Sequence, residues 1–314
     1  MALILINHTM PVGEHIIRTQ NEQRHIEQLS AQKEIYSTAK GLFYAQCVIA
    51  TLVPVLISTL QTIFPSATES FMWVFGLYSA NASITEVILD RIITKLKNTA
   101  ASIQEAFDCA VLGIEWNSVL VPEKPLLETI QRYHAQYTEK KSVNKLYDWY
   151  SIEIAEVQTN IGTVICQRTN CVYDFSIRKK YSAGMGILAV ITFIVLLSTS
   201  AMTGLTLPKF IVNVIAPSIP IFMLAIRQYF ANADSIDNLK SLKSLLEGAI
   251  LNASIDSTIS GQSIRQIQDK IYNNRTLSPL LPDWVFKRYR SKLESQMHYS
   301  VRQIISDIKS RNTG

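Results

Sequence analysis

Four apolar stretches, arranged as two closely spaced pairs, constrain this 314-residue chain more than any other feature. They cover residues 42–64, 71–93, 185–205 and 210–230. Each stretch has about 20 residues, which is enough for a helix to cross a hydrocarbon core ~30 Å thick. Only a few residues join the members of each pair, so the chain must turn back within it. The pattern predicts two transmembrane helical hairpins. The alternative is that the stretches are buried helices of a large soluble protein.

The second stretch is the least apolar of the four, because it contains Asn81, Glu86, Asp90 and Arg91. An acidic side chain near the centre of a bilayer costs a few kcal/mol, and such residues usually face a bundle interior or a water-filled path. We therefore predict that Asn81, Glu86 and Asp90 line a cation-selective pore. The alternative is that the span ends near Ile84 and that the charged residues lie at the interface.

Basic residues gather on one side of all four stretches. The two hairpin tips together contain a single basic residue, Lys209. The positive-inside rule then places both termini and the middle segment in the cytoplasm. The predicted organisation has five parts: an N-terminal cytoplasmic amphipathic segment at 1–41, a first transmembrane hairpin at 42–93, a cytoplasmic helical region at 94–184, a second hairpin at 185–230 and a C-terminal cytoplasmic helical region at 231–314. No cleavable signal peptide is expected, because the opening apolar run is short and lacks a basic region.

The segments outside the apolar stretches favour helices, so the predicted fold is all-α. Helices are predicted at 96–114, 126–140, 143–180, 234–251 and 284–309. Pro125 suits the first turn of the second of these helices, and Asp283 is expected to cap the last. The helix at 143–180 is expected to continue into the third stretch, and the helix at 234–251 to continue the fourth. Gly261 and the Asn273–Asn274 pair interrupt the pattern.

Composition and motifs exclude several classes of function. The net charge of +5 is too mild and dispersed to predict binding of a nucleic-acid polymer. Cys166 and Cys171 form a C-x4-C pattern without further ligands at matching spacing, so neither a metal site nor a cofactor is predicted. The sequence lacks G-x-S-x-G, H-E-x-x-H and phosphate-binding G-x-x-x-x-G-K-[ST] motifs, and its five histidines are isolated. We do not expect an enzyme.

A set of short motifs points to a family. The set consists of FDCAVLGIEWN at 107–117, DWYS at 148–151, CQRTNCVYDFSIRKKY at 166–181, IRQIQDKIYNNR at 264–275 and SPLLPDW at 278–284. In this order it resembles the SMODS-associated four-transmembrane effector family, often called S-4TM, over most of the chain. The resemblance implies a pore-forming effector of bacterial anti-phage defence in the inner membrane, opened by a cyclic oligonucleotide. Four helices are too few to line a wide pore, so the chain is expected to form homo-oligomers in the lipid bilayer.

A cyclic di- or trinucleotide ligand needs cations for its phosphates, rings that stack on its bases and amides that read base edges. The candidate ligand-binding residues with these properties are Trp116, Asn117, Trp149, Tyr150, Arg168 and Tyr173. A second set consists of Arg265 and Arg275, with Lys287, Arg288 and Arg290 nearby in sequence. The alternative is that the aromatic residues belong to the core and the cations to the surface. The alternative function is a non-conducting scaffold that recruits a soluble partner through its C-terminal helices.

Overall fold

The computed structural model describes residues 13–49, 53, 56–57, 64, 69–202, 206–211, 215–256 and 259–312. The α-helices are α1 (Glu14–Gln20), α2 (Gln23–Cys47), α5 (Met72–Leu112), α6 (Leu127–Thr138), α7 (Thr159–Met202), α8 (Leu207–Phe210), α9 (Ala216–Asp256), α10 (Gly261–Leu277) and α11 (Asp283–Asn312). Three short 3-10 helices are η2 (Glu69–Phe71), η3 (Val143–Leu146) and η4 (Ile152–Glu156). No strand occurs among the described residues, and the prediction of an all-α fold is confirmed.

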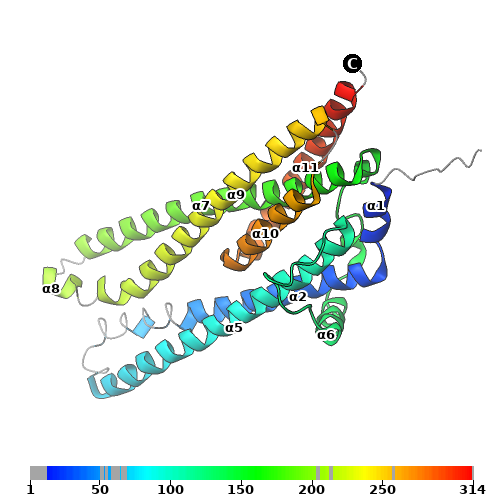
Figure 1. The fold of residues 1–314 in the computed structure, drawn as a ribbon. Coiled ribbons are helices and arrows are strands. Elements are labelled where there is room, and N and C mark those ends of the chain that lie inside the picture. Colours follow the sequence, from blue (N-terminus) through cyan, green and yellow to red (C-terminus); the bar gives the residue numbers. More distant parts are fainter. Residues whose placement is uncertain are drawn as a thin grey trace, which may run out of the picture.

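Two pairs of long helices dominate the fold (Figure 1). Helix α2 packs along α5, and α7 packs along α9, and all four extend toward the same end of the molecule. Each of these helices crosses one of the predicted boundaries between an apolar stretch and its flanking segment, at 41/42, 93/94, 184/185 and 230/231. The apolar stretches and the helices outside them are therefore continuous, as the sequence predicted for α7 and α9.

The core lies at the opposite end of the four long helices, where α10 contacts α5, α7 and α9. Apolar side chains from eight α-helices meet there, among them Phe107, Ile165, Leu246, Ile267 and Ile305. Helix α6 packs against α2, and α11 packs against α7. Helix α10 thus contacts both long pairs, and it lies between them in Figure 1.

Two predicted boundaries are wrong. Helix α7 begins at Thr159 and not at residue 143, because the segment before it forms the short 3-10 helices η3 and η4. Between them the Tyr150 N–H donates to the Gln20 side chain over 2.7 Å and not to a helical carbonyl. Helix α10 runs through the Asn273–Asn274 pair, where the sequence predicts an interruption. Burial of its apolar face outweighs the low helix propensity of asparagine, and Ser260 caps its first turn by accepting from the Ser263 N–H.

Within the part of the chain that the structure describes, no helix combines the length and the apolar character that a membrane crossing requires. Parts of the predicted stretches at 42–64, 185–205 and 210–230 lie outside the described residues. The four predicted membrane spans are therefore not confirmed, and the predicted topology stays a prediction.

Candidate functional site

Two acidic residues of α5, Glu105 and Asp108, lie in the core with exposed fractions of 1% and 0%. Two arginines of α10 neutralise them: Arg265 Nη2 lies 2.6 Å from Glu105 Oε1, and Arg275 Nη2 lies 2.7 Å from Asp108 Oδ2. The Gln268 amide donates to both carboxylates, over 2.8 and 3.1 Å. Buried charges are costly unless they are paired and hydrogen-bonded. These contacts therefore tie α10 specifically to α5.

Tyr150 and Asn117 extend this buried network. The Tyr150 hydroxyl donates to Asp108 over 2.8 Å, and Asn117 donates to Asp269 over 3.0 Å. Burial, and then the charge of Asp108, raises the pKa of Tyr150 well above its usual value. Burial alone would lower the pKa of Arg275, but the Asp108 and Glu105 carboxylates outweigh it and raise that pKa. The network thus uses four candidate ligand-binding residues, Asn117, Tyr150, Arg265 and Arg275, in contacts within the chain.

Two further candidates, Trp116 and Arg168, also make contacts within the chain. The Trp116 indole N–H donates to the Val121 carbonyl over 2.9 Å. Arg168 of α7 donates to Glu247 of α9 and to Ser300 of α11, both over 3.0 Å. Arg168 therefore links three helices and is already neutralised by a carboxylate.

Lys33 of α2 has a different environment, because its Nζ lies 4.8 Å from the centre of the Trp149 ring. Among the described residues, no carboxylate or other hydrogen-bonding group pairs with Lys33. Burial first, then the charge of Arg290, lowers the pKa of Lys33 to about 8; Glu294 opposes this effect and Lys141 adds to it. A lysine with a depressed pKa and no counter-ion is an electrostatically unsatisfied group.

The contact between α2 and α11 explains why Arg290 lies near Lys33. Lys40 Nζ lies 2.6 Å from Asp283 Oδ1 and 4.6 Å from the centre of the Phe286 ring, which fixes the start of α11 beside α2. Lys33 lies about two turns before Lys40, and Arg290 lies about two turns after Asp283. The contact at Lys40 therefore holds the first turns of α11 beside α2, and the charge of Arg290 acts on Lys33.

The remaining candidate, Tyr173 of α7, shares these charged neighbours. Burial is the main cause that raises the pKa of Tyr173. The charge of Glu294 raises this pKa further, and the charge of Arg290 opposes the shift. We call the group formed by Lys33, Lys141, Trp149, Tyr173, Arg290 and Glu294 the Lys33 cluster. Arg290 Nε pairs with Glu294 over 2.6 Å, and both side chains are more than 40% exposed. The cluster has three cations and one carboxylate, and a solvent path reaches Arg290.

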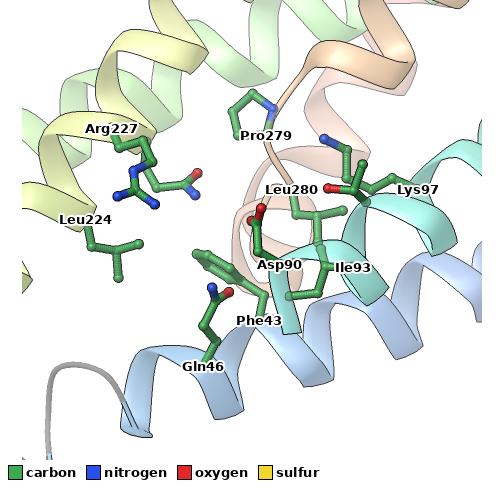
Figure 2. A pocket seen from close by; sticks show the side chains of 11 residues that line it. Phe43, Gln46, Asp90, Ile93, Lys97, Leu224, Arg227, Pro279 and Leu280 are labelled. Atoms are coloured by element: carbon green, nitrogen blue, oxygen red, sulfur yellow. The ribbon is translucent and has the colours of Figure 1, made fainter. Parts of the chain in front are cut away.

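A cavity of about 80 Å³ lies between the two long helix pairs (Figure 2). Its lining residues are Phe43 and Gln46 of α2, Asp90, Ile93, Thr94 and Lys97 of α5, Leu224, Arg227 and Gln228 of α9, and Pro279 and Leu280 before α11. One water needs roughly 10–15 Å³ in this measure, so the cavity admits a few waters and not a whole dinucleotide. Burial, then the charge of Arg178, lowers the pKa of Lys97 to about 8, while Asp90 opposes this shift.

The three predicted pore-lining residues lie on α5 near this cavity or beyond it. Asp90 lines the cavity, and the Glu86 carboxylate lies 3.6 Å from Arg227 of α9. The Asn81 amide donates to the Leu77 carbonyl within its own helix over 2.8 Å. Glu86 and Arg227 thus connect the two helix pairs, and the pore-lining role of all three residues stays a prediction.

Sequence reasoning missed Glu105, Asp108 and Lys33. The first two are separated by one turn within an otherwise apolar helix face, which is a signal for a buried ionic network. Lys33 follows Ile26 and Leu29 on the buried face of α2, which is a similar signal. Among the described residues, no group of three or more His, Cys, Asp or Glu side chains is placed to hold a metal ion.

Comparison with known proteins assigns the family. The family described as the SMODS-associating 4TM effector domain matches residues 14–304. The chain belongs to this family. This S-4TM chain is 24% identical, over 297 residues, to a protein of Bacillus cereus strain VD146 named as a probable CBASS effector molecule. The match covers 90% of this chain and 95% of that relative. No solved structure matches the chain. The family resemblance predicted from the sequence motifs is thus confirmed.

Proposed function

We propose that this S-4TM protein is a non-enzymatic membrane effector of bacterial anti-phage defence that permeabilises the inner membrane when it binds a cyclic oligonucleotide. The family and the B. cereus relative support the role in anti-phage defence. Membrane insertion, pore formation and activation by a nucleotide are our proposals. Several subunits are required, because one chain supplies too few helices for a wide pore.

The observation that carries the membrane proposal is a division within the long helices. One half of α5 is packed in the core, whereas its other half exposes large apolar side chains, with exposed fractions of 68% for Trp73 and 70% for Val87. Helices α7 and α9 have the same division, with Ile187 and Met223 exposed in their outer halves. Exposed apolar surface on this scale marks an interaction with lipid or with another protein. Lipid, together with neighbouring subunits, is the covering we propose.

Because these helices are continuous, a rearrangement in the packed half is transmitted directly to the outer half. Such a switch needs a ligand that prefers the open assembly: moving a population from 1:99 to 99:1 requires about 5.5 kcal/mol of differential binding. A cyclic oligonucleotide with several charge-assisted hydrogen bonds, each contributing ~1.5–3 kcal/mol, can supply it.

The test is leakage of ions and of a small dye from liposomes that contain the purified full-length protein. Cyclic di- and trinucleotides are added one at a time, and the linear dinucleotide of the same bases serves as the ligand control. We expect leakage with one cyclic nucleotide and none with its linear form. Protein insertion is checked separately by resistance to carbonate extraction.

The outcomes separate the hypotheses. Inserted protein that never causes leakage, although the same nucleotide binds it, would refute the pore and favour the scaffold. Deletion of residues 283–314 then provides a second comparison, because a scaffold would lose its partner without any change in conductance. Protein that does not insert into the bilayer would refute the membrane proposal itself.

A further inference from the structure

The Lys33 cluster has more cations than carboxylates, because Glu294 is its single acidic residue and already pairs with Arg290. Lys33 lies against Trp149, and no carboxylate among the described residues forms an ion pair with it. The charges acting on Lys33 are those of Arg290, Glu294 and Lys141, and Glu294 pairs with Arg290. Burying one cation near another is unfavourable, and an anion placed between them removes both the repulsion and the cost of lost hydration. In contrast, the carboxylates Glu105, Asp108 and Glu247 already neutralise Arg265, Arg275 and Arg168.

The chemistry around Lys33 narrows the class of anion. A guanidinium and an ammonium group on facing helices suit a phosphodiester, and the Trp149 ring lies directly beneath the ammonium. A phosphate that draws Lys33 away from the ring uncovers an aromatic face, on which a nucleobase can stack. Inorganic phosphate or a lipid headgroup would use only the cations, because neither contains a base.

We propose that the Lys33 cluster is the site that binds the cyclic oligonucleotide, with a phosphodiester between Lys33 and Arg290 and a base stacked on Trp149. This assignment rests on the proposed function for the identity of the ligand. Lys33 belongs to α2 and Arg290 to α11, and the Lys40–Asp283 ion pair joins the same two helices. A ligand that bridges α2 and α11 therefore acts at the contact between the first helix pair and the C-terminal helix.

The test is equilibrium binding of the active cyclic nucleotide to the full-length protein in detergent, measured by calorimetry. Lys33→Met and Arg290→Met should each weaken binding at least tenfold. The matched controls are Lys145→Met and Arg288→Met, which remove exposed cations outside the cluster and should change the dissociation constant less than twofold. Trp149→Leu should also weaken binding, whereas Trp149→Phe should retain most of it.

One variant should strengthen binding. Glu294 pairs with Arg290 over 2.6 Å and competes with the phosphate for it, so Glu294→Gln is expected to tighten binding severalfold. A misfolded protein cannot produce that gain. Glycerophosphoglycerol and inorganic phosphate serve as ligands without a base, and both should bind at least tenfold more weakly than the nucleotide.

The site and the proposed function fail separately. If liposomes containing the Lys33→Met or the Arg290→Met variant still leak at the nucleotide concentration that activates the wild-type protein, the proposed site is wrong and the proposed function stands. If both variants abolish binding but the wild-type protein never leaks, the pore is wrong and the site stands. Tighter binding of glycerophosphoglycerol than of any nucleotide would overturn the assignment in favour of a lipid headgroup. An unchanged nucleotide affinity in Glu294→Gln would also overturn it, because the phosphate would then not compete with Glu294 for Arg290.

Discussion

Arg275→Leu should destabilise the protein strongly, because it leaves Glu105 and Asp108 in the core with one arginine between them. Arg275 lies 2.7 Å from Asp108 and 3.9 Å from Glu105. At an effective dielectric constant of about 20 these separations correspond to about 6 and about 4 kcal/mol of attraction, before the cost of desolvation. Desolvation cancels several kcal/mol, and Gln268 and Tyr150 still donate to Asp108 in the variant. The expected loss of stability is about 3–5 kcal/mol.

Thermal unfolding in detergent, followed by intrinsic fluorescence, measures this effect. An unfolding entropy of about 2.1 cal/mol/K per residue gives about 0.66 kcal/mol/K for the 314-residue chain, so the Tm should fall by about 5–8 °C. Arg302→Leu is the control, because its ion pair with Glu153 is long, at 3.9 Å, and its side chain is 59% exposed; we expect a change below about 1 °C.

A double-mutant cycle isolates the ion pair itself. Arg275→Leu leaves Asp108 without a cationic partner, whereas Glu105 keeps Arg265. Adding Asp108→Asn removes that unpaired charge, so the double variant should recover about 2 kcal/mol relative to the sum of the single effects. A decrease in Tm of less than 2 °C for Arg275→Leu would refute the conclusion that this network ties α10 to α5. Strict additivity of the Arg275→Leu and Asp108→Asn effects would refute it as well.

Three further predictions concern other parts of the fold. The pKa of Lys33 is lowered to about 8 in the folded protein, so unliganded stability should rise as pH increases from about 8 toward 10.5, where the unfolded chain still binds the proton. Nucleotide affinity should fall over the same range because Lys33 loses its charge; calorimetry and thermal unfolding at pH 7, 8 and 9 test both effects, and Lys33→Met should abolish them. Gly113 ends α5 at φ +67°, so Gly113→Ala should cost about 1 kcal/mol in chemical denaturation, whereas Gly248→Ala, which has free space within α9, should be neutral or stabilising. Lys40→Met should cost less than about 1 kcal/mol, because Asp283 is 54% exposed, and a larger fall in Tm would mean that the contact between α2 and α11 depends on this ion pair.

Local patterns in the sequence predicted much of the fold, because helical periodicity and capping are local properties. The positions of α6 and α11, and the continuation of the third and fourth apolar stretches into α7 and α9, followed from spacing and from the residues expected at helix starts. Helix α10 was missed because Asn273 and Asn274 have low helix propensity, and tertiary burial of Ile264, Ile267 and Ile271 decides the outcome. No local signal reports burial against helices 100 residues away.

The candidate site was harder to predict for the same reason. The residue types arginine, tyrosine and asparagine are suited equally to contacts with a ligand and to contacts with a buried carboxylate, so residue type alone does not distinguish the two. The sequence therefore selected Arg265, Arg275 and Tyr150 without revealing that Glu105 and Asp108 are their partners. Trp149 and Tyr173 were selected as candidate ligand-binding residues, and that role stays a prediction. The lysine that lies over the Trp149 ring is in α2, more than 100 residues earlier, and was not selected with them. Tertiary contacts of α2, such as those of Lys33 with Trp149 and of Lys40 with Asp283, bring these residues together.

The unbroken course of α5 gives the molecule a lever arm. From Glu105, where α10 is attached, to Met72 at the other end of the helix are 33 residues, or about 50 Å at 1.5 Å per residue. A rigid rod of that length that tilts by about 5° at its anchored end moves its free end sideways by about 4 Å, which is more than a third of the ~10 Å diameter of a helix with its side chains. A change in tilt at the α5–α10 contact that is too small to break an ion pair is thus enough to change which residues of adjacent long helices face one another at the far end.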